Sequence, residues 1–315
     1  MDRLQLMLSS ILLVAFLNVN AQQLPLFTQY REYQTILNPA AIGSNYFALD
    51  QNLTFGASYR NQWTGFKNAP TTATIRGEYL FENTGFSLLS GGYILHDQTG
   101  PTGNTGVYGR VGGVISGDPY YGGISVALSG GMVQYRVNGD EIFLRESGDI
   151  LDNQSQSKLS PDVGFGVYAY KNIRNGDYVY GGFSVPQILG LDLSYKTDNG
   201  EYHTQRIQHM FATAGYLLRF KDEGFIEPTV WAKYVKGADV NVDFNFKYQM
   251  QTSFWIGLGG STAKTVHAEA GFLIGENAGL DNTIRIGYGF DYSFSSFGPF
   301  TGSTHEFSVS YSLDR

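Results

Sequence analysis

The sequence predicts an all-β fold, a transmembrane outer-membrane β-barrel of about 14 antiparallel strands. The main observation lies at residues 240–251, where apolar side chains occupy the even positions and polar side chains the odd ones. A strand with this pattern has one apolar face and one polar face. The same alternation recurs at residues 284–294 and 307–313. About ten tilted residues cross a bilayer, whereas a soluble β-sandwich with such strands would expose an apolar belt to water.

Composition is the second observation. Charged residues make up 16% of the chain, below the roughly 25% of soluble domains, while Gly, Tyr and Phe number 40, 22 and 22. This balance is typical of a barrel whose outer wall faces lipid. The net charge is -7 and no basic run occurs, so nucleic acid is not an expected partner. Cysteine is absent, which excludes disulfides, thiolate metal sites and a cysteine nucleophile.

The N-terminus predicts export. Arg3 precedes a mostly apolar run at residues 4–17, and small residues end it at Ala21, so we expect residues 1–21 to be a signal peptide cleaved after Ala21. The apolar run is shorter than the roughly 20 residues of a membrane-spanning helix, which disfavours an N-terminal anchor. The mature chain contains no second hydrophobic helix, so any membrane crossing must be made by strands.

Residues 22–48 form a segment without the two-residue alternation, and this segment contains Pro25, Asn38-Pro39 and Gly43. It is rich in apolar residues, so we expect it to fold into the barrel lumen or to cover the periplasmic mouth. A flexible periplasmic tail is the alternative. Residues 49–315 are expected to form the barrel.

Turn residues divide the barrel region into fourteen expected strands. They begin near Leu49, Thr71, Gly85, Gly103, Tyr121, Asp162, Asp177, Gln208, Phe225, Asp239, Thr252, Val266, Thr283 and Ser303. An even number suits a barrel with both termini in the periplasm. Such barrels have short periplasmic turns and longer outer loops, and the outer loops expected here are residues 62–70, 96–104, 138–161 and 187–206. In the C-terminal half of the chain, the expected connections separate less clearly into short inner turns and long outer loops.

The ionisable residues give little indication of catalysis. His305 and Glu306 are adjacent in a strand and point to opposite faces, so they cannot share a pocket, and His267 with Glu269 forms only a pair. The other charged and amide side chains fall on the polar phase of their strands and are expected to face a polar lumen: Arg76, Glu78, Asn241, Asp243, Asn245, Lys247, Arg285 and Asp291. No serine elbow, phosphate-binding loop or zinc spacing occurs. We therefore predict no enzyme activity, catalytic residue, cofactor or metal.

Several short sequence motifs are not explained by a generic barrel. Trp63 alone is typical of an aromatic belt, and Pro70 alone suits the start of a strand. Their joint occurrence with neighbouring motifs resembles the PorP/SprF family of the type IX secretion system of Bacteroidota over nearly the whole mature sequence. The resemblance is carried by residues 25–30 with 37–40 and Gly43, residues 59–63 with 69–72, Asp97 with Gly100-Pro101, and residues 287–292 with 305–306. Leu24, Arg31 and the final residues 313–315 depart from the family pattern.

This resemblance implies a non-enzymatic outer-membrane barrel that works with the secretion apparatus. Some family members are partners of the periplasmic ring or motor, and SprF-like members serve secreted surface adhesins with a type B C-terminal domain in gliding motility. The SprF-like role is favoured here, and a passive porin is the alternative. The candidate partner-binding residues are Asn38, Pro39, Arg60, Asn61, Gln62, Trp63, Pro70, Thr71, Thr72, Asp97, Gly100, Asp291, His305 and Glu306.

Overall fold

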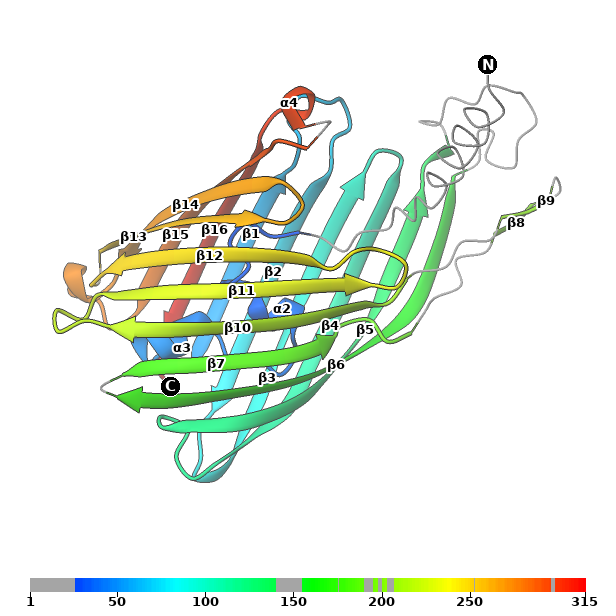
Figure 1. Cartoon of the computed structure of the whole chain (residues 1–315). Helices are drawn as coiled ribbons and strands as arrows, with labels where there is room; N and C mark the ends of the chain where they lie inside the picture. Colours follow the sequence, from blue (N-terminus) through cyan, green and yellow to red (C-terminus); the bar gives the residue numbers. More distant parts are fainter. Residues whose placement is uncertain are drawn as a thin grey trace, which may run out of the picture.

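The computed structural model describes residues 26–139, 155–174, 176–189, 195–197, 200–202, 207–251, 253–295 and 298–315. The expected signal peptide lies outside these residues. Within them, fourteen strands close into one antiparallel barrel, with β1 paired to β16 (Figure 1). The predicted fold class is confirmed.

The barrel strands vary in length around the ring. In chain order they are β1 (Leu53–Asn61), β2 (Thr71–Phe81), β3 (Gly85–Thr99), β4 (Thr102–Ser116), β5 (Gly122–Val137), β6 (Gln156–Arg174), β7 (Asp177–Val185), β10 (His209–Arg219), β11 (Phe225–Val235), β12 (Asn241–Met250), β13 (Phe254–Ser261), β14 (Thr265–Ile274), β15 (Thr283–Ser293) and β16 (Thr304–Leu313). Two short strands, β8 (Tyr195–Thr197) and β9 (Gly200–Tyr202), form a separate hairpin inside an expected outer loop.

Twelve of the fourteen expected strand starts lie within two residues of the observed ones. The start expected at Leu49 is wrong because helix α3 continues to that residue, and Asp50 then adopts a left-handed conformation with φ 56°. The start expected at Asp162 is wrong because β6 begins at Gln156 and includes Pro161.

The expected outer loop at residues 96–104 is also wrong. Strands β3 and β4 run to Thr99 and from Thr102, and only Gly100 and Pro101 join them. Gly100 has φ 54°, which glycine adopts without a steric penalty, so the hairpin turns in two residues. The Gly, Asn and Thr content that indicated a loop belongs instead to two long paired strands.

Side chains alternate between the two faces of the barrel as predicted. The outer face is apolar, with Phe55, Ile75 and Val107 among its exposed side chains. The inner face is polar, and all but one of the expected lumen residues are buried there, while Asn241 is half-buried. An apolar exterior of this kind suits contact with lipid.

Residues 26–52, here termed the plug, lie inside the barrel. The plug contains the short helices α2 (Gln34–Leu37) and α3 (Ser44–Leu49), and almost all of its side chains are buried (Figure 1). Of the segment expected in the lumen or over the periplasmic mouth, the structure describes residues 26–48, and these lie in the lumen. Among the described residues, no helix has the length and apolar character required to cross a bilayer.

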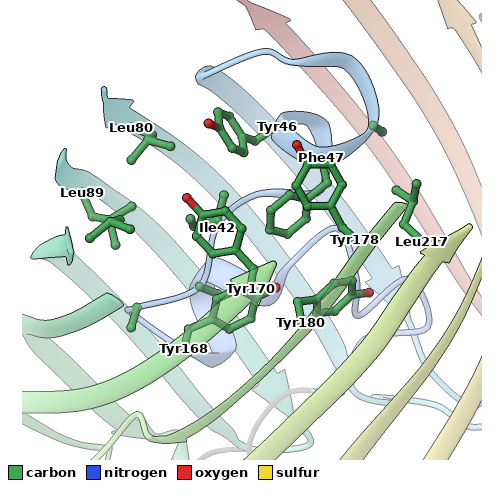
Figure 2. Packing of buried hydrophobic residues seen from close by; sticks show 14 of the residues in the cluster. Ile42, Tyr46, Phe47, Leu80, Leu89, Tyr168, Tyr170, Tyr178, Tyr180 and Leu217 are labelled. Atoms are coloured by element: carbon green, nitrogen blue, oxygen red, sulfur yellow. The ribbon is translucent and has the colours of Figure 1, made fainter. Parts of the chain in front are cut away.

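Aromatic packing fixes the C-terminal half of the plug against one wall. Phe47 lies with its ring centroid 5.2, 4.9 and 5.6 Å from those of Tyr170, Tyr178 and Tyr180 (Figure 2). Such contacts each add to the stabilisation that area burial provides. The plug is therefore held by β6 and β7 through an apolar core.

The two ends of the barrel differ. At the plug end lie α3 and the C-terminus, and the side-chain amide of Asn52 donates to the carbonyl oxygen of Arg315 at 2.8 Å. Only a few residues join consecutive strands there, as at residues 82–84 and 220–224. The opposite, loop end carries residues 62–70 and the long connections after β5 and β7, but it also carries the short turns at residues 100–101 and 262–264, while residues 275–282 at the plug end are longer. The expected separation of short and long connections therefore holds only in part.

Candidate functional site

The predicted site residues separate into an inner group that holds the plug and an outer group at the loop end. Asn38, Pro39, Arg60, Asp291 and Glu306 belong to the inner group. The outer group is Asn61, Gln62, Trp63, Pro70, Thr71, Thr72, Asp97, Gly100 and His305. The structure does not bring all fourteen together.

Arg60 on β1 is the centre of the inner group. Its guanidinium lies 2.5 Å from the Asp291 carboxylate of β15 and 3.1 Å from the Glu306 carboxylate of β16. It also donates to the hydroxyl of Thr28. Glu306 in turn accepts the backbone N–H groups of Thr28 at 2.8 Å and Gln29 at 3.2 Å. Charges buried this deeply are tolerated only when they are paired and hydrogen-bonded. We term these contacts the N-terminal anchor, because they tie the start of the plug to three strands.

Asn38 and Pro39 dock against the opposite wall. The side-chain amide of Asn38 donates to the carbonyl of Val167 at 3.0 Å, and its oxygen accepts the N–H of Ala40 at 2.9 Å. Glycines make this approach possible. A Cβ on Gly166 would lie 3.0 Å from Pro39 Cδ and would collide with Asn38, so β6 needs a residue without a side chain there.

Between these contacts runs a network of buried ion pairs. Arg31 of the plug lies 2.8 Å from Glu227 on β11, and Lys247 on β12 lies 3.0 Å from the same carboxylate. Glu32 of the plug is 3.5 Å from Lys247 and 3.6 Å from Arg285 on β15. The plug thus contributes one cation and one anion to a lumen of mixed charge.

The charge of Glu32 is stabilised by this network. Burial favours the neutral acid, but the nearby Arg285, Lys247 and Arg76 outweigh it and lower the pKa of Glu32 to about 2. In the sequence Arg31 stands out only as a departure from the family pattern, and Glu32 does not stand out. An Arg-Glu pair in an otherwise uncharged segment, residues 22–48, is the feature that could have indicated both.

The outer group forms a rigid platform. The N–H of Gln62 donates to the carbonyl of Pro70 at 2.8 Å, and the N–H groups of Thr64 and Gly65 donate to Ser303 and Thr301 at 3.0 Å each. The first bond closes the β1–β2 loop, and the other two join this loop to the end of helix α4 (Gly298–Thr301) and to the residues after it. We term residues 62–70 and 298–303 the loop platform.

Aromatic side chains project from the loop platform. Trp63 adopts a left-handed conformation with φ 56°, and its N–H donates to the hydroxyl of Thr304. The side chain of Trp63 is exposed, as are those of Phe66 and Phe300, and Phe300 is 78% exposed. The platform therefore presents apolar rings on a backbone held by hydrogen bonds.

The remaining outer residues brace the platform from β2 and β3. The hydroxyl of Thr72 donates to the Asp97 carboxylate at 2.6 Å, and the N–H of Gly100 donates to the carbonyl of Asn68 at 3.1 Å. Thr71 pairs in register with Asn61 on one side and Gln98 on the other. Residues 61–63, residues 70–72, Asp97 and Gly100, which were unexplained as separate motifs, thus meet in one loop assembly.

His305 and Glu306 lie on opposite faces of β16. His305 points outward, where its ring nitrogens lie 2.6 Å from the hydroxyl of Tyr288 and 2.8 Å from that of Ser303. Glu306 points inward, so the prediction that the two cannot share a pocket is confirmed. Glu269 instead accepts the side-chain amide of Asn245 at 2.6 Å. The described part of the chain contains no group of three or more side chains arranged to hold a metal ion.

Comparison with known proteins identifies the family. The sequence matches the family described as type IX secretion system membrane protein PorP/SprF over residues 19–311. No curated protein matches it. Among solved structures, the CymD monoaromatic hydrocarbon channel is similar with TM-score 0.52 and 10% identity, covering 87% of this chain and 93% of that one. The Pseudomonas putida toluene transporter TodX gives TM-score 0.51 and 9% identity, covering 88% and 96%. At these identities the likeness concerns the fold alone, which is that of an outer-membrane barrel. The chain belongs to the PorP/SprF family of type IX secretion system membrane proteins.

Proposed function

We propose that this protein is a plugged, non-enzymatic outer-membrane scaffold of type IX secretion. In this role the loop end binds a secreted surface adhesin with a type B C-terminal domain. The plug end, where α3 and the C-terminus lie, faces the periplasm and contacts the periplasmic ring or motor. The observation that carries the proposal is the plug itself, whose buried charges are tied to β1, β11, β12, β15 and β16.

The filled lumen supports a scaffold over a passive porin. A diffusion channel requires a continuous water path, whereas here the plug's Tyr30 and Tyr33 lie fully buried among luminal side chains. The hydroxyl of Tyr30 lies 2.6 Å from that of Thr229 on the wall. Solute passage would require these contacts to break, and nothing in the fold likeness to hydrocarbon channels supplies a reason for that.

The loop platform supports partner binding at the loop end. Interfaces are enriched in aromatic residues, and exposed Trp and Phe side chains on a preorganised backbone bind with little loss of conformational entropy. The platform meets both conditions through Trp63, Phe66 and Phe300. The plug end offers a different surface, where Tyr120 and Tyr121 are exposed beside short turns.

Co-purification from detergent extracts tests this assignment. The double variant Trp63→Ala/Phe66→Ala should lose the secreted adhesin and retain the ring components. Tyr121→Ala, an aromatic truncation at the opposite end, is the matched control and should retain the adhesin. Recovery of wild-type barrel with no secreted protein attached would contradict the proposal, and loss of the adhesin only with Tyr121→Ala would reverse the orientation.

A further inference from the structure

The plug runs through the lumen in one direction, which its contacts with β16 define. Strand β16 starts at the loop end and finishes at the plug end, beside the C-terminus (Figure 1). Near the start of this strand, Glu306 accepts the N–H of Thr28 at 2.8 Å. Further along it, the hydroxyl of Ser308 donates to the side-chain oxygen of Gln29 at 3.0 Å. The order of these plug residues therefore follows β16 inward from the loop end.

The later contacts of the plug continue this order to the plug end. The side-chain amide of Asn45 in α3 donates to the hydroxyl of Ser312 at 2.6 Å, and that of Asn52 donates to the carbonyl oxygen of Arg315. Ser312 lies six residues after Glu306 in the chain. At a rise of roughly 3.3 Å per residue, this separation is about 20 Å of strand. The plug thus begins close to the loop end and reaches the plug end only at α3.

The start of the plug lies close to the base of the loop platform. Arg60, which donates to the hydroxyl of Thr28, precedes Gln62 of the platform by two residues. Glu306 follows Ser303 of the platform by three residues. Arg60 and Glu306 belong to β1 and β16, which pair with each other to close the barrel. Thr28 is therefore held where these two strands meet, next to the outer loops.

Chain length limits where the residues ahead of Leu26 can lie. Gln23 precedes Leu26 by three residues. Three fully extended residues span at most about 11 Å, whereas the hydrocarbon core of a bilayer is about 30 Å thick. Towards the plug end, the lumen is occupied by the plug itself, whose Tyr30 and Tyr33 are fully buried. A segment this short cannot return past the plug to the plug end.

We propose that the mature chain enters the barrel from the loop end and presents its N-terminal segment on the outer face of the membrane, beside the loop platform. The two termini then lie at opposite ends of the barrel. This arrangement differs from the expectation that an even number of strands places both termini in the periplasm. The segment ahead of the plug adds to the surface that the loop end offers to a partner. The outward direction of the loop end rests on the function proposed above, whereas the position of the segment at the loop end does not.

Cysteine labelling of intact cells tests the proposal, because the sequence contains no cysteine. The variants are Gln23→Cys ahead of the plug, Lys67→Cys on the loop platform and Asp222→Cys in the plug-end turn, and the native side chains of the last two are exposed. Each variant is treated with a membrane-impermeant maleimide before and after permeabilisation of the outer membrane. Gln23→Cys and Lys67→Cys should label in intact cells, and Asp222→Cys should label only after permeabilisation.

The labelling pattern separates this inference from the proposed function. If Gln23→Cys labels only after permeabilisation while Lys67→Cys labels in intact cells, the inference is overturned and the outward orientation of the loop end stands. If both label only after permeabilisation and Asp222→Cys labels in intact cells, the N-terminal segment still lies at the loop end. In that case the orientation in the proposed function is overturned.

An inserted epitope gives a second readout, which decides the result if Gln23→Cys stays unlabelled under both conditions. An epitope with a flexible linker, inserted after Gln23, should bind its antibody on intact cells. The same epitope placed after Arg315 is the matched control and should bind only after permeabilisation. Both proteins should keep the gel mobility of the folded barrel. Binding at the Gln23 insertion only after permeabilisation, in cells whose Lys67→Cys barrel labels from outside, would overturn the inference.

Discussion

At the scale of single residues, Glu306 of β16 forms a buried contact with the plug. It is fully buried and satisfied by two plug N–H groups and by Arg60. Removing one partner of a buried ion pair typically costs about 3–5 kcal/mol, because the other charge is left uncompensated. We expect Glu306→Ala to lower stability by about 3 kcal/mol, measured as the temperature at which the folded barrel loses its gel mobility.

His305→Ala is the control for this measurement. His305 is the neighbour of Glu306 on the same strand but points outward, so it should shift the transition by much less. Equal shifts for the two variants would show that the N-terminal anchor contributes no more stability than the contacts of an outward-facing residue of β16.

Gly166 gives a second prediction at this scale. A methyl group there would collide with Asn38 and displace the Asn38-Pro39 turn from β6. Gly166→Ala should therefore loosen the plug, which can be followed by the fluorescence of Trp231, whose ring lies 5.4 Å from that of Tyr30. Gly130→Ala is the matched control on β5, because a Cβ at Gly130 meets no atom within 4 Å. The emission maximum should shift to the red in Gly166→Ala alone. A red shift in both variants or in neither would contradict the contact between Gly166 and Asn38.

Glu32 makes the plug sensitive to acid. Its pKa falls from an ordinary 4.5 to about 2 in the folded protein, since burial is outweighed by three nearby cations. A depressed carboxyl pKa stabilises the fold fully above pH 4.5, and this contribution is lost as the pH falls from there towards 2. The loss amounts to about 3 kcal/mol by linkage. Unfolding curves should show it, and Glu32→Gln should flatten this part of the pH profile. If the pH profile of stability were the same in Glu32→Gln as in the wild type, Glu32 would not be the source of the acid sensitivity.

At the scale of elements, the wall strands were predictable and the plug was predictable only in outline. Strands such as β12 and β15 alternate strictly because one face meets lipid and the other the lumen, so sequence defines their bounds. The plug follows no such period, because its residues contact the wall in all directions. Its location could be inferred from apolar content, but the pairing of Arg31 with Glu227 depends on strands far away in sequence.

The errors of prediction at this scale have local causes. Pro161 suggested a loop because proline is excluded from the middle of a sheet, yet β7 pairs with β6 only from Phe165 on, so Pro161 does not lie between these two strands. Among the site residues, sequence could name Arg60, Asp291 and Glu306 but could not show that both carboxylates contact Arg60. Only closure of β1 on β16 brings these residues together.

A disulfide tests whether the plug acts as a fixed element. The chain has no cysteine, so Thr28→Cys/Gly289→Cys introduces a unique pair, at a site where a Cβ on Gly289 would lie 2.9 Å from the Cβ of Thr28, within about 1 Å of the spacing in a disulfide. We expect the pair to cross-link under mild oxidation and to leave secretion and adhesin binding unchanged, because a scaffold needs no plug movement. Loss of function that dithiothreitol restores would show that the plug must move. Each single cysteine variant serves as the control.

At the scale of the whole molecule, the barrel wall and the plug complement each other. The wall buries no apolar core of its own across the lumen, so the plug supplies the apolar rings and counter-charges that the inner face needs. Without it, Lys247 and Arg285 would face water in an open lumen. Closure of the channel therefore follows from the same contacts that stabilise the fold.

Conductance in planar bilayers measures that closure directly. Wild-type protein should conduct little, and deletion of residues 26–48 should open stable channels, because the strands remain joined by backbone hydrogen bonds while the lumen loses its filling. Arg60→Ala, which releases the N-terminal anchor, should give intermittent openings, whereas the outward His305→Ala should remain closed. Steady conductance of the wild-type barrel would mean that water passes the seated plug. That result would favour a channel over the scaffold proposed here.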